Sequence, residues 1–374
     1  MNPCTEIDMK FMGGKPASRP ALWTALCRAG LRGAIALASL LVSTVGHACG
    51  QPIGGIDPFS IVSLRLENDW LGASGQDRGY TSGVQISATT GDLNRVADRD
   101  CLPVLVRGIG RSLDWLHPRR PDLAHVAIGV GQGLFTPSDR AATDPIPGDR
   151  PYAAVLLVGV GYIARNGEHW SASQLRVGIA GPSALGEQVQ NSAHRVFGGV
   201  AWAGWRNQLR DEPVFQLVHQ RLRHWGAWPA AGGWRQDLIG HWGASLGNLA
   251  TYAGAGIEWR LGRQLPDDIG SNPRRLAGMH LAPAGQFTLQ DDWAYHFFVS
   301  VDARAVAHDI TLDGNAWKRS GSVDKRVFVA DLGLGLTVSR GPWKLTVARY
   351  NRTREFASQQ LRPVFGSVTI TRRF

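Results

Sequence analysis

Three residues with oxygen-bearing side chains lie close together near the start of the predicted fold. Asn68 and Asp69 end one alternating segment, and Thr81 opens the next. If the two segments form a hairpin, a carboxamide, a carboxylate and a hydroxyl meet at its tip. Hard cations such as calcium take oxygen ligands, so Asp69 and Thr81 are candidate metal ligands. The same residue types also form ordinary hairpin turns, and spacing alone favours that structural interpretation.

A histidine lies in the clearest helical pattern of the chain. Within residues 184–197, polar side chains recur at helical spacing on one face: Glu187, Gln190, Asn191 and His194. Imidazole exchanges protons near neutral pH, which makes His194 a candidate general base. A lone histidine on a loop helix is also common as an ordinary surface residue. Features elsewhere in the chain are needed to distinguish a catalytic histidine from a surface one.

Two serines near this histidine raise the alternative of a hydrolase with a serine nucleophile. Such a nucleophile needs a base within hydrogen-bond reach. Ser192 stands two residues before His194 on the predicted helix and points away from it. Ser183, just before the helix, stays open as a nucleophile.

Short segments of alternating apolar and polar residues predict the β-strands that position these groups. The first segment, FSIVSLRLEND, ends at Asp69, and the second, YTSGVQISATT, begins at Tyr80. The alternation puts Asp69 and Thr81 on the polar faces. Asn68 and Tyr80 fall on the opposite, apolar faces. Further strands are predicted near residues 123–134, 150–164, 170–181, 213–224, 234–247, 250–262, 293–307, 324–339, 343–356 and 364–374.

This pattern predicts an all-β fold, a twelve-stranded antiparallel transmembrane β-barrel with a short helix in an extracellular loop. Closure of an even number of strands leaves no unpaired edge in lipid. The last strand ends on Phe374, and a terminal aromatic residue on the lipid face resembles the assembly signal of bacterial outer-membrane proteins. Arg372 shares that face and suits the membrane interface. A soluble β-sandwich is the alternative.

The predicted topology sorts the connections between strands. With both ends of the barrel chain in the periplasm, the connections at 70–79, 135–149 and 181–212 are extracellular, and those at 165–168 and 340–342 are short periplasmic turns. Two long connections, 91–122 and 263–292, fall on the periplasmic side, so either they are insertions or a strand is misplaced. The first contains VLVRGIGRSLDWL, which predicts a small amphipathic helix that packs against the barrel.

The N-terminal region predicts export. Two arginines, an apolar run and a small-x-small site fit a signal peptide over residues 1–48, which leaves 49–374 for an outer-membrane barrel. A lipoprotein acylated at Cys49 is the weaker alternative, and a disulfide between Cys49 and Cys101 stays open. The four cysteines lack zinc spacing, which argues against a cysteine-based zinc site.

The chain has 374 residues and a formal net charge of +10, and it stays basic without the leader. In an exported protein this favours an anionic surface such as phosphorylated glycolipid over nucleic acid as the partner. Whether the barrel forms oligomers stays open.

Several motifs in order resemble those of a known family. They are LENDW, DRGYTSG, LFTPSD, GDRPYA, GEQVQNSAHR and GWRNQLRDEP, and with the closing strand they span nearly the whole mature chain. Together they resemble the lipid A 3-O-deacylase family of outer-membrane barrels. The resemblance implies calcium-dependent hydrolysis of the 3-linked acyl ester of lipid A at the outer leaflet of the outer membrane.

The resemblance also implies roles for individual residues. His194 matches the family's general base, which activates a water, and Asn68, Asp69 and Thr81 match its active-site and calcium-associated positions. Calcium near Asp69 and Thr81 would stabilise the oxyanion. Lipid A or lipopolysaccharide is then the substrate, and outer-membrane lipids surround the barrel.

One departure from the family concerns its active-site glutamate. The position six residues after His194 holds Val200 here. Either Glu187 takes over the acidic role, which its helical spacing slightly favours, or Asp211 or Glu212 does, or no acid is required. The departure also leaves open a weakened, altered or absent hydrolase activity.

A non-enzymatic barrel, either a porin or a surface-binding protein, is the alternative function. It predicts no need for His194 and no effect of calcium. Basic residues at the rim are candidates for pairing with lipid A phosphates, although each also suits a solvated rim: Arg78, Arg140, Arg150 and Arg195.

Overall fold

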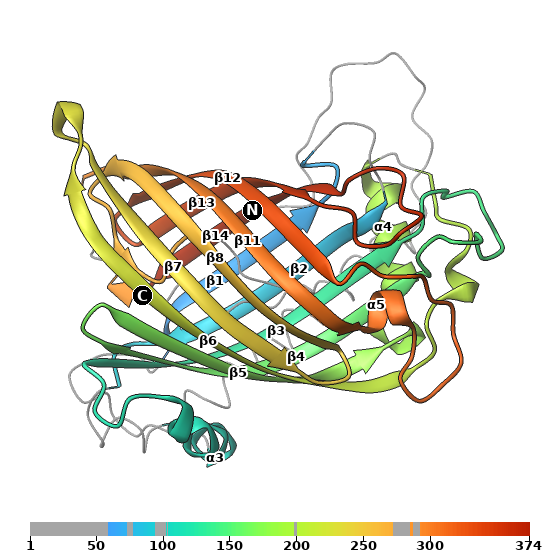
Figure 1. The fold of residues 1–374 in the computed structure, drawn as a ribbon, viewed down its shortest axis with the longest axis horizontal. Coiled ribbons are helices and arrows are strands. Elements are labelled where there is room, and N and C mark those ends of the chain that lie inside the picture. Colours follow the sequence, from blue (N-terminus) through green and yellow to red (C-terminus); the bar gives the residue numbers. More distant parts are fainter. Residues whose placement is uncertain are drawn as a thin grey trace, which may run out of the picture. The chain divides into compact units, whose positions relative to one another are not determined.

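The chain forms a closed barrel of twelve antiparallel strands (Figure 1). The computed structural model describes residues 59–72, 78–93, 102, 104–197, 200–271, 285–286 and 292–374. The wall strands are β1 Phe59–Asn68, β2 Gly79–Thr90, β3 Leu123–Thr136, β4 Ala153–Asn166, β5 His169–Ala180, β6 Glu212–Pro229, β7 Arg235–Leu246, β8 Ala250–Arg263, β11 Ala294–Asp309, β12 Phe328–Arg340, β13 Trp343–Arg352 and β14 Val364–Arg373. Pairing of β1 with β14 closes the wall.

The alternation of the sequence separates the two faces of this wall. Along β1, Glu67 is 1% exposed and points into the lumen, whereas its neighbour Leu66 is 44% exposed on the outer face. Ile370 of β14 and Phe374, which directly follows β14, likewise lie exposed on the outside. A wall with an apolar exterior and no open edge suits a bilayer. The predicted fold class is confirmed.

The strand directions create two ends, which we call the loop end and the turn end. The loop end carries the connections 69–78, 137–152, 181–211, 247–249, 310–327 and 353–363, with helices α4 (Gly186–Phe197) and α5 (Ile310–Asp313). The turn end carries 91–122, 167–168, 230–234, 264–293 and 341–342, with helix α3 (Val104–Leu113). Figure 1 shows α4 and α5 at the opposite end of the barrel from α3. Three of the five connections at the turn end are only two to five residues long, as the periplasmic turns of outer-membrane barrels are, which makes the loop end the extracellular end.

The prediction that Tyr80 faces lipid was wrong. Tyr80 is 3% exposed, and its hydroxyl donates a hydrogen bond to Glu67 on the lumen side. The pairing of β2 with β3 shifts between Tyr80 and Ser82, so Thr81 is the extra residue of a β-bulge. A bulge resets the alternation of faces, and the residue pattern alone does not reveal it.

Aromatic side chains fill the lumen toward the loop end. The rings of Tyr80 and Phe135 lie 5.3 Å apart, and those of Tyr350 and Phe365 lie 5.1 Å apart. Phe298 belongs to the same buried cluster. The lumen at this level therefore holds packed aromatic rings, with the guanidinium of Arg352 over the Phe365 ring and in buried ion pairs with Asp331 and Glu355.

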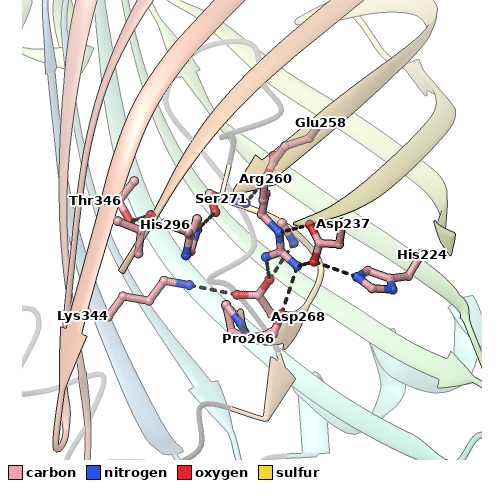
Figure 2. Close-up of polar contacts among 12 residues, drawn as sticks. His224, Asp237, Glu258, Arg260, Pro266, Asp268, Ser271, His296, Lys344 and Thr346 are labelled. Atoms are coloured by element: carbon pink, nitrogen blue, oxygen red, sulfur yellow. Dashed lines mark hydrogen bonds and ion pairs between the residues drawn. The ribbon is translucent and has the colours of Figure 1, made fainter. Parts of the chain in front are cut away.

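Charged side chains fill the lumen toward the turn end. Asp268, from the short strand β9 (Asp267–Asp268), accepts bonds from Arg260 at 2.6 Å and Lys344 at 2.9 Å (Figure 2). Arg260 also donates to Asp237 at 2.6 Å. The long connection after β8 is thus an insertion whose first part folds back into the barrel, and no wall strand is misplaced there.

The long connection between β2 and β3 is also an insertion, and it contains the predicted amphipathic helix as α3. A one-turn 3₁₀ helix, η1 (Asp114–Leu116), follows it directly. Within the part of the chain that the structure describes, no helix is long and apolar enough to cross a membrane. The predictions for the leader 1–48, for acylation of Cys49 and for a bond between Cys49 and Cys101 lie outside the described residues.

Candidate functional site at the outer rim of the barrel

The hairpin tip between β1 and β2 is organised by the carboxylate of Asp69. Its Oδ1 accepts the N–H of Trp70 at 2.8 Å, and its Oδ2 accepts the N–H of Arg78 at 2.6 Å. The Asn68 Oδ1 also accepts the Trp70 N–H at 2.8 Å. These bonds satisfy backbone donors where the two strands separate, so both side chains have a structural role as turn residues.

Thr81 joins this tip to the neighbouring strand. Its carbonyl oxygen accepts the N–H of Asp69 at 3.2 Å. Its hydroxyl lies 2.6 Å from the hydroxyl of Thr136, the last residue of β3. The structure therefore brings Asn68, Asp69 and Thr81 together, as the hairpin prediction expected.

Asn68 lies on the outer face of the wall. It pairs with Ser82 on β2 and with Gly366 on β14, and it alternates with the lumen residues Glu67 and Asp69. An amide at the lipid-facing rim is costly unless polar groups meet it.

Helix α4 packs against the outer face of β3 and β4. The outward side chains of Leu134 and Ala154 are buried there beneath Ala184, Trp202 and Trp205. Alternation places Leu134 on the outside, because its neighbour Phe135 is in the lumen cluster. The loop that carries α4 thus folds down over the lipid-facing side of the wall instead of over the mouth of the barrel.

Polar bonds and a close approach fix this packing. Gln132, on the outer face of β3, donates to the carbonyl of Ala184 at 2.6 Å. The indole N–H of Trp205 donates to the Gln190 Oε1 at 2.9 Å. A Cβ on Gly186 would lie 2.5 Å from the Ala154 Cβ, so glycine permits the close contact of helix and wall. Gln190, predicted on the polar face of the helix, is buried by this packing.

His194 is half-buried in the second half of α4, and its imidazole is oriented by the backbone. The His194 Nδ1 lies 2.7 Å from the carbonyl oxygen of Val200. A carbonyl can only accept, so Nδ1 carries the proton and Nε2 is the basic nitrogen. Val200 stands where the family has a glutamate, and it contributes its backbone carbonyl, a contact that the residue pattern alone does not reveal.

The three acidic candidates differ in their surroundings. Glu187 is exposed in the first turn of α4. Asp211 accepts bonds from the hydroxyl of Ser183 at 2.8 Å and from its N–H at 2.7 Å. Glu212 is fully buried and accepts the N–H groups of Ala316 and Trp317. Asp211 and Glu212 therefore fasten loops, and Glu187 is the candidate with a solvent-facing carboxylate.

The serine alternative gains nothing from these contacts. Ser183 donates its hydroxyl hydrogen to Asp211, and the Ser192 hydroxyl accepts a bond from Arg195 on the same helix at 3.1 Å. A carboxylate can hold Ser183 but is a weak base for activating it at neutral pH.

The predicted calcium ligands are one acidic residue, Asp69, and one hydroxyl residue, Thr81. No group of three or more His, Cys, Asp or Glu side chains that could hold a metal is found among the described residues. Asp69 and Thr81 do offer carboxylate, hydroxyl and carbonyl oxygen, the donors that calcium prefers. The two N–H bonds to Asp69 are compatible with coordination, because a carboxylate has about four acceptor positions.

The rim arginines divide into structural and accessible groups. Arg150, expected at the rim, is 2% exposed, and its guanidinium contacts Glu355 at 3.2 Å and Thr311 at 2.9 Å. Arg195 bonds within α4. Arg78 lines a cleft of about 300 Å³ at the loop end, which Arg150 and Arg362 also border. Arg150 was expected either to pair with a lipid A phosphate or to be a solvated rim charge, and both expectations were wrong, since it is buried and Glu355 neutralises it.

Comparison with known proteins places the chain among outer-membrane barrels. A family model described as "Outer membrane protein LpxR" matches residues 34–374. Among solved structures, LpxR from Salmonella typhimurium is similar with 21% identity and a TM-score of 0.67, over 84% of this chain and 100% of that chain. The β domain of the Bordetella autotransporter BrkA matches with 12% identity and a TM-score of 0.41, over 85% of this chain and 100% of that one. No curated protein matches.

Proposed function

Because the chain belongs to the LpxR family of outer membrane proteins, we propose that it is a lipid A 3-O-deacylase. It hydrolyses the 3-linked acyl ester of lipid A at the outer leaflet and requires calcium. The protein is an outer-membrane β-barrel, so this substrate surrounds its extracellular rim.

The packing of α4 on the lipid-facing side of the wall is the observation that carries this proposal. We infer that the substrate binds beside this helix on the outer face of the wall, a position that is accessible sideways from the leaflet. Asn68 lies on that same outer face, and the hydroxyl contact of Thr81 with Thr136 joins the hairpin tip to β3. A lipid-linked ester reaches such a site without entering the barrel.

His194 acts as the general base. The Val200 carbonyl holds the Nδ1 proton, so Nε2 takes a proton from a water. The water oxygen attacks the acyl carbonyl carbon, and the carbonyl oxygen becomes an oxyanion. When the tetrahedral intermediate collapses, the imidazolium returns the proton to the leaving sugar oxygen. The products are a free fatty acid and a 3-hydroxyl group.

The remaining candidates position these groups. Asn68 would orient the water or the substrate from the outer face, and the exposed carboxylate of Glu187 would favour the imidazolium. Asp69 and Thr81 are the residues that would hold calcium at the hairpin tip. Calcium, when bound, supplies positive charge for the oxyanion.

Mass spectrometry of lipid A tests this proposal. Detergent-folded protein and the His194→Ala variant are incubated with lipid A, each with calcium and with chelator. We expect loss of one 3-linked acyl chain only with wild-type protein and calcium, and a rate about 10²- to 10⁴-fold lower without the base.

His169→Ala is the matched control, because His169 is an exposed histidine at the turn end of β5. It should leave deacylation unchanged. If lipid A stays intact in every sample while the barrel is folded, the protein is a non-enzymatic barrel and the deacylase proposal fails.

A further inference from the structure

Helix α3 lies on the outside of the barrel at the turn end. Ala124 and Val126 of β3 have outward positions, as do Tyr162 and Ala164 of β4, which pair with them. All four are nevertheless buried, and they form one apolar cluster with Val106 of α3. The helix therefore covers the lipid-facing surface of the wall at this end.

The segment after α3 is held against the same surface. The His117 Nδ1 lies 2.7 Å from the hydroxyl of Ser171 on β5. The His117 ring packs edge-on against Tyr162, with ring centroids 4.5 Å apart. Leu113 at the end of α3 is buried. These contacts fix the helix and η1 in one orientation relative to the wall.

The opposite surface of this segment is apolar and exposed. Val104 is 76% exposed, Leu105 is 74% exposed and Trp115 is 77% exposed, each more than the wall residue Ile370 at 43%. Basic side chains border this surface and are also exposed: Arg111, Arg119 and Arg120. An apolar surface bordered by arginine is the composition of helices that lie in a membrane interface.

The same end of the barrel carries an aromatic girdle. Trp343 and Phe374 are exposed on the outer face at the turn end, and the guanidinium of Arg372 lies over both rings, at 5.1 and 4.5 Å from their centroids. Aromatic and arginine pairs of this kind mark the level of the lipid headgroups. Trp115 projects from a helix on the same outer face of the barrel at this end.

We propose that α3 and η1 form an interfacial anchor that inserts Val104, Leu105 and Trp115 into the periplasmic leaflet. The partner is a phospholipid surface with anionic headgroups, whose phosphates pair with the exposed arginines. The exposed apolar surface is continuous with the lipid-facing wall of the barrel. For this reason the bilayer is the partner that contacts it. The anchor serves the barrel whether or not the protein deacylates lipid A.

Lipid-borne quenchers test the insertion. In full-length protein with its cysteines replaced by serine, an environment-sensitive fluorophore is attached at Leu105→Cys and the barrel is folded into phosphatidylethanolamine and phosphatidylglycerol vesicles. We expect nitroxide on the acyl chains to quench this label as strongly as a label at the wall position Ile370→Cys. A label at Glu168→Cys, in the exposed turn between β4 and β5, should be quenched far less.

Headgroup preference is measured with the same label. Nitroxide carried by phosphatidylglycerol should quench about twofold or more strongly than nitroxide carried by phosphatidylcholine in the same vesicles. In the combined Arg111→Gln, Arg119→Gln and Arg120→Gln variant, quenching by the phosphatidylglycerol nitroxide and quenching by the phosphatidylcholine nitroxide should become equal. Quenching by nitroxide on the acyl chains should persist.

Heat-dependent gel migration verifies that each labelled barrel is folded. If the Leu105 label behaves like the Glu168 label in folded protein, the anchor does not exist. If wild type shows no preference between the two headgroups, the assignment of an anionic partner is wrong.

Discussion

At the scale of single residues, the orientation of His194 depends on a backbone atom. In a catalytic triad a carboxylate holds the histidine proton on Nδ1, which leaves Nε2 to act on the substrate side. Here the carbonyl of Val200 lies 2.7 Å from Nδ1 and favours the same tautomer. A neutral carbonyl stabilises the imidazolium less than a carboxylate does, so the base should work with a smaller electrostatic contribution.

The Val200→Glu variant tests how much an acid at this position adds. The Val200 side chain is 59% exposed, so glutamate should fit without loss of stability. Because the carbonyl contact is retained, we expect the rate of deacylation to rise by about tenfold at most, the effect of one modest charge contact. Single-turnover measurements of fatty acid release provide the rate. A rise of several orders of magnitude would show that the carbonyl does not replace the acid.

Thr81 and Thr136 form a matched pair that separates structure from chemistry. Their hydroxyls are 2.6 Å apart, so replacing either one with valine removes the same hydrogen bond. If Thr81 is a calcium-associated residue, Thr81→Val should lower activity and apparent calcium affinity by about 10- to 100-fold. Thr136→Val should then have a small effect. Equal losses in the two variants, measured by calcium titration of activity, would assign Thr81 a structural role only.

At the scale of elements, the site depends on the contact between α4 and the wall. The helix has few intrinsic reasons to be stable alone, since short helices gain most of their stability from tertiary packing. Trp202 and Trp205 provide this packing, and Gly186 allows the close approach. The polar bond from Gln132 to Ala184 then fixes the position of the helix along β3.

Gly186→Leu should move α4 away from the wall. A side chain there meets Ala154 and the Trp205 ring at 2.5–2.7 Å from the Cβ, so the helix has to shift. We expect deacylation to fall about 100-fold, because misplacement of about 1 Å has effects of this size. Gly110→Leu in α3 is the control, since nothing lies within 4 Å of its Cβ position. A folded Gly186→Leu barrel with full activity would contradict the assigned role of α4.

At the scale of the whole molecule, two layers of side chains cross the lumen. Aromatic rings and the ion pairs of Arg352 with Asp331 and Glu355 fill the loop-end half, and the cluster around Arg260 and Asp268 fills the turn end. This packing resembles the filled interior of small barrels more than the aqueous channel of porins. It gives the porin alternative little support. It also ties the inserted β9 segment to strands on different sides of the lumen, as Figure 2 shows for Arg260 and Lys344.

The ion pairs of Asp268 predict a pH-dependent stability. Burial raises the pKa of Asp268, but Lys344 and Arg260 outweigh burial and lower it below the ordinary value. Stability from this carboxylate is therefore present above about pH 4 and is lost as the pH falls further. Asp268→Asn should cost about 3 kcal/mol in free energy of unfolding at pH 7 and much less at low pH.

Denaturant unfolding of the vesicle-embedded barrel at both pH values measures the cost of Asp268→Asn. Asp267→Asn is the adjacent control, because the Asp267 carboxylate is about half exposed and pairs with Arg165 near the surface. It should cost less than about 1 kcal/mol. Equal costs for the two variants would show that the buried cluster does not stabilise the barrel.

The sequence by itself determined the wall of the barrel. The alternation of side chains is a local property of each strand, and so the twelve strands, their faces outside the bulge at Thr81 and the outward Phe374 follow from the residues. The hairpin that joins Asp69 to Thr81 follows in the same way, because neighbouring strands pair across a short connection.

Only the tertiary structure decided the environment of each site residue. The bulge at Thr81 turns Tyr80 into the lumen, the packing of α4 on the outer wall buries Gln190, and the returning chain presents the Val200 carbonyl to His194. Each of these depends on contacts between segments far apart in sequence. Periodicity records which face of a strand or helix is apolar, and it does not record which other segment will cover that face.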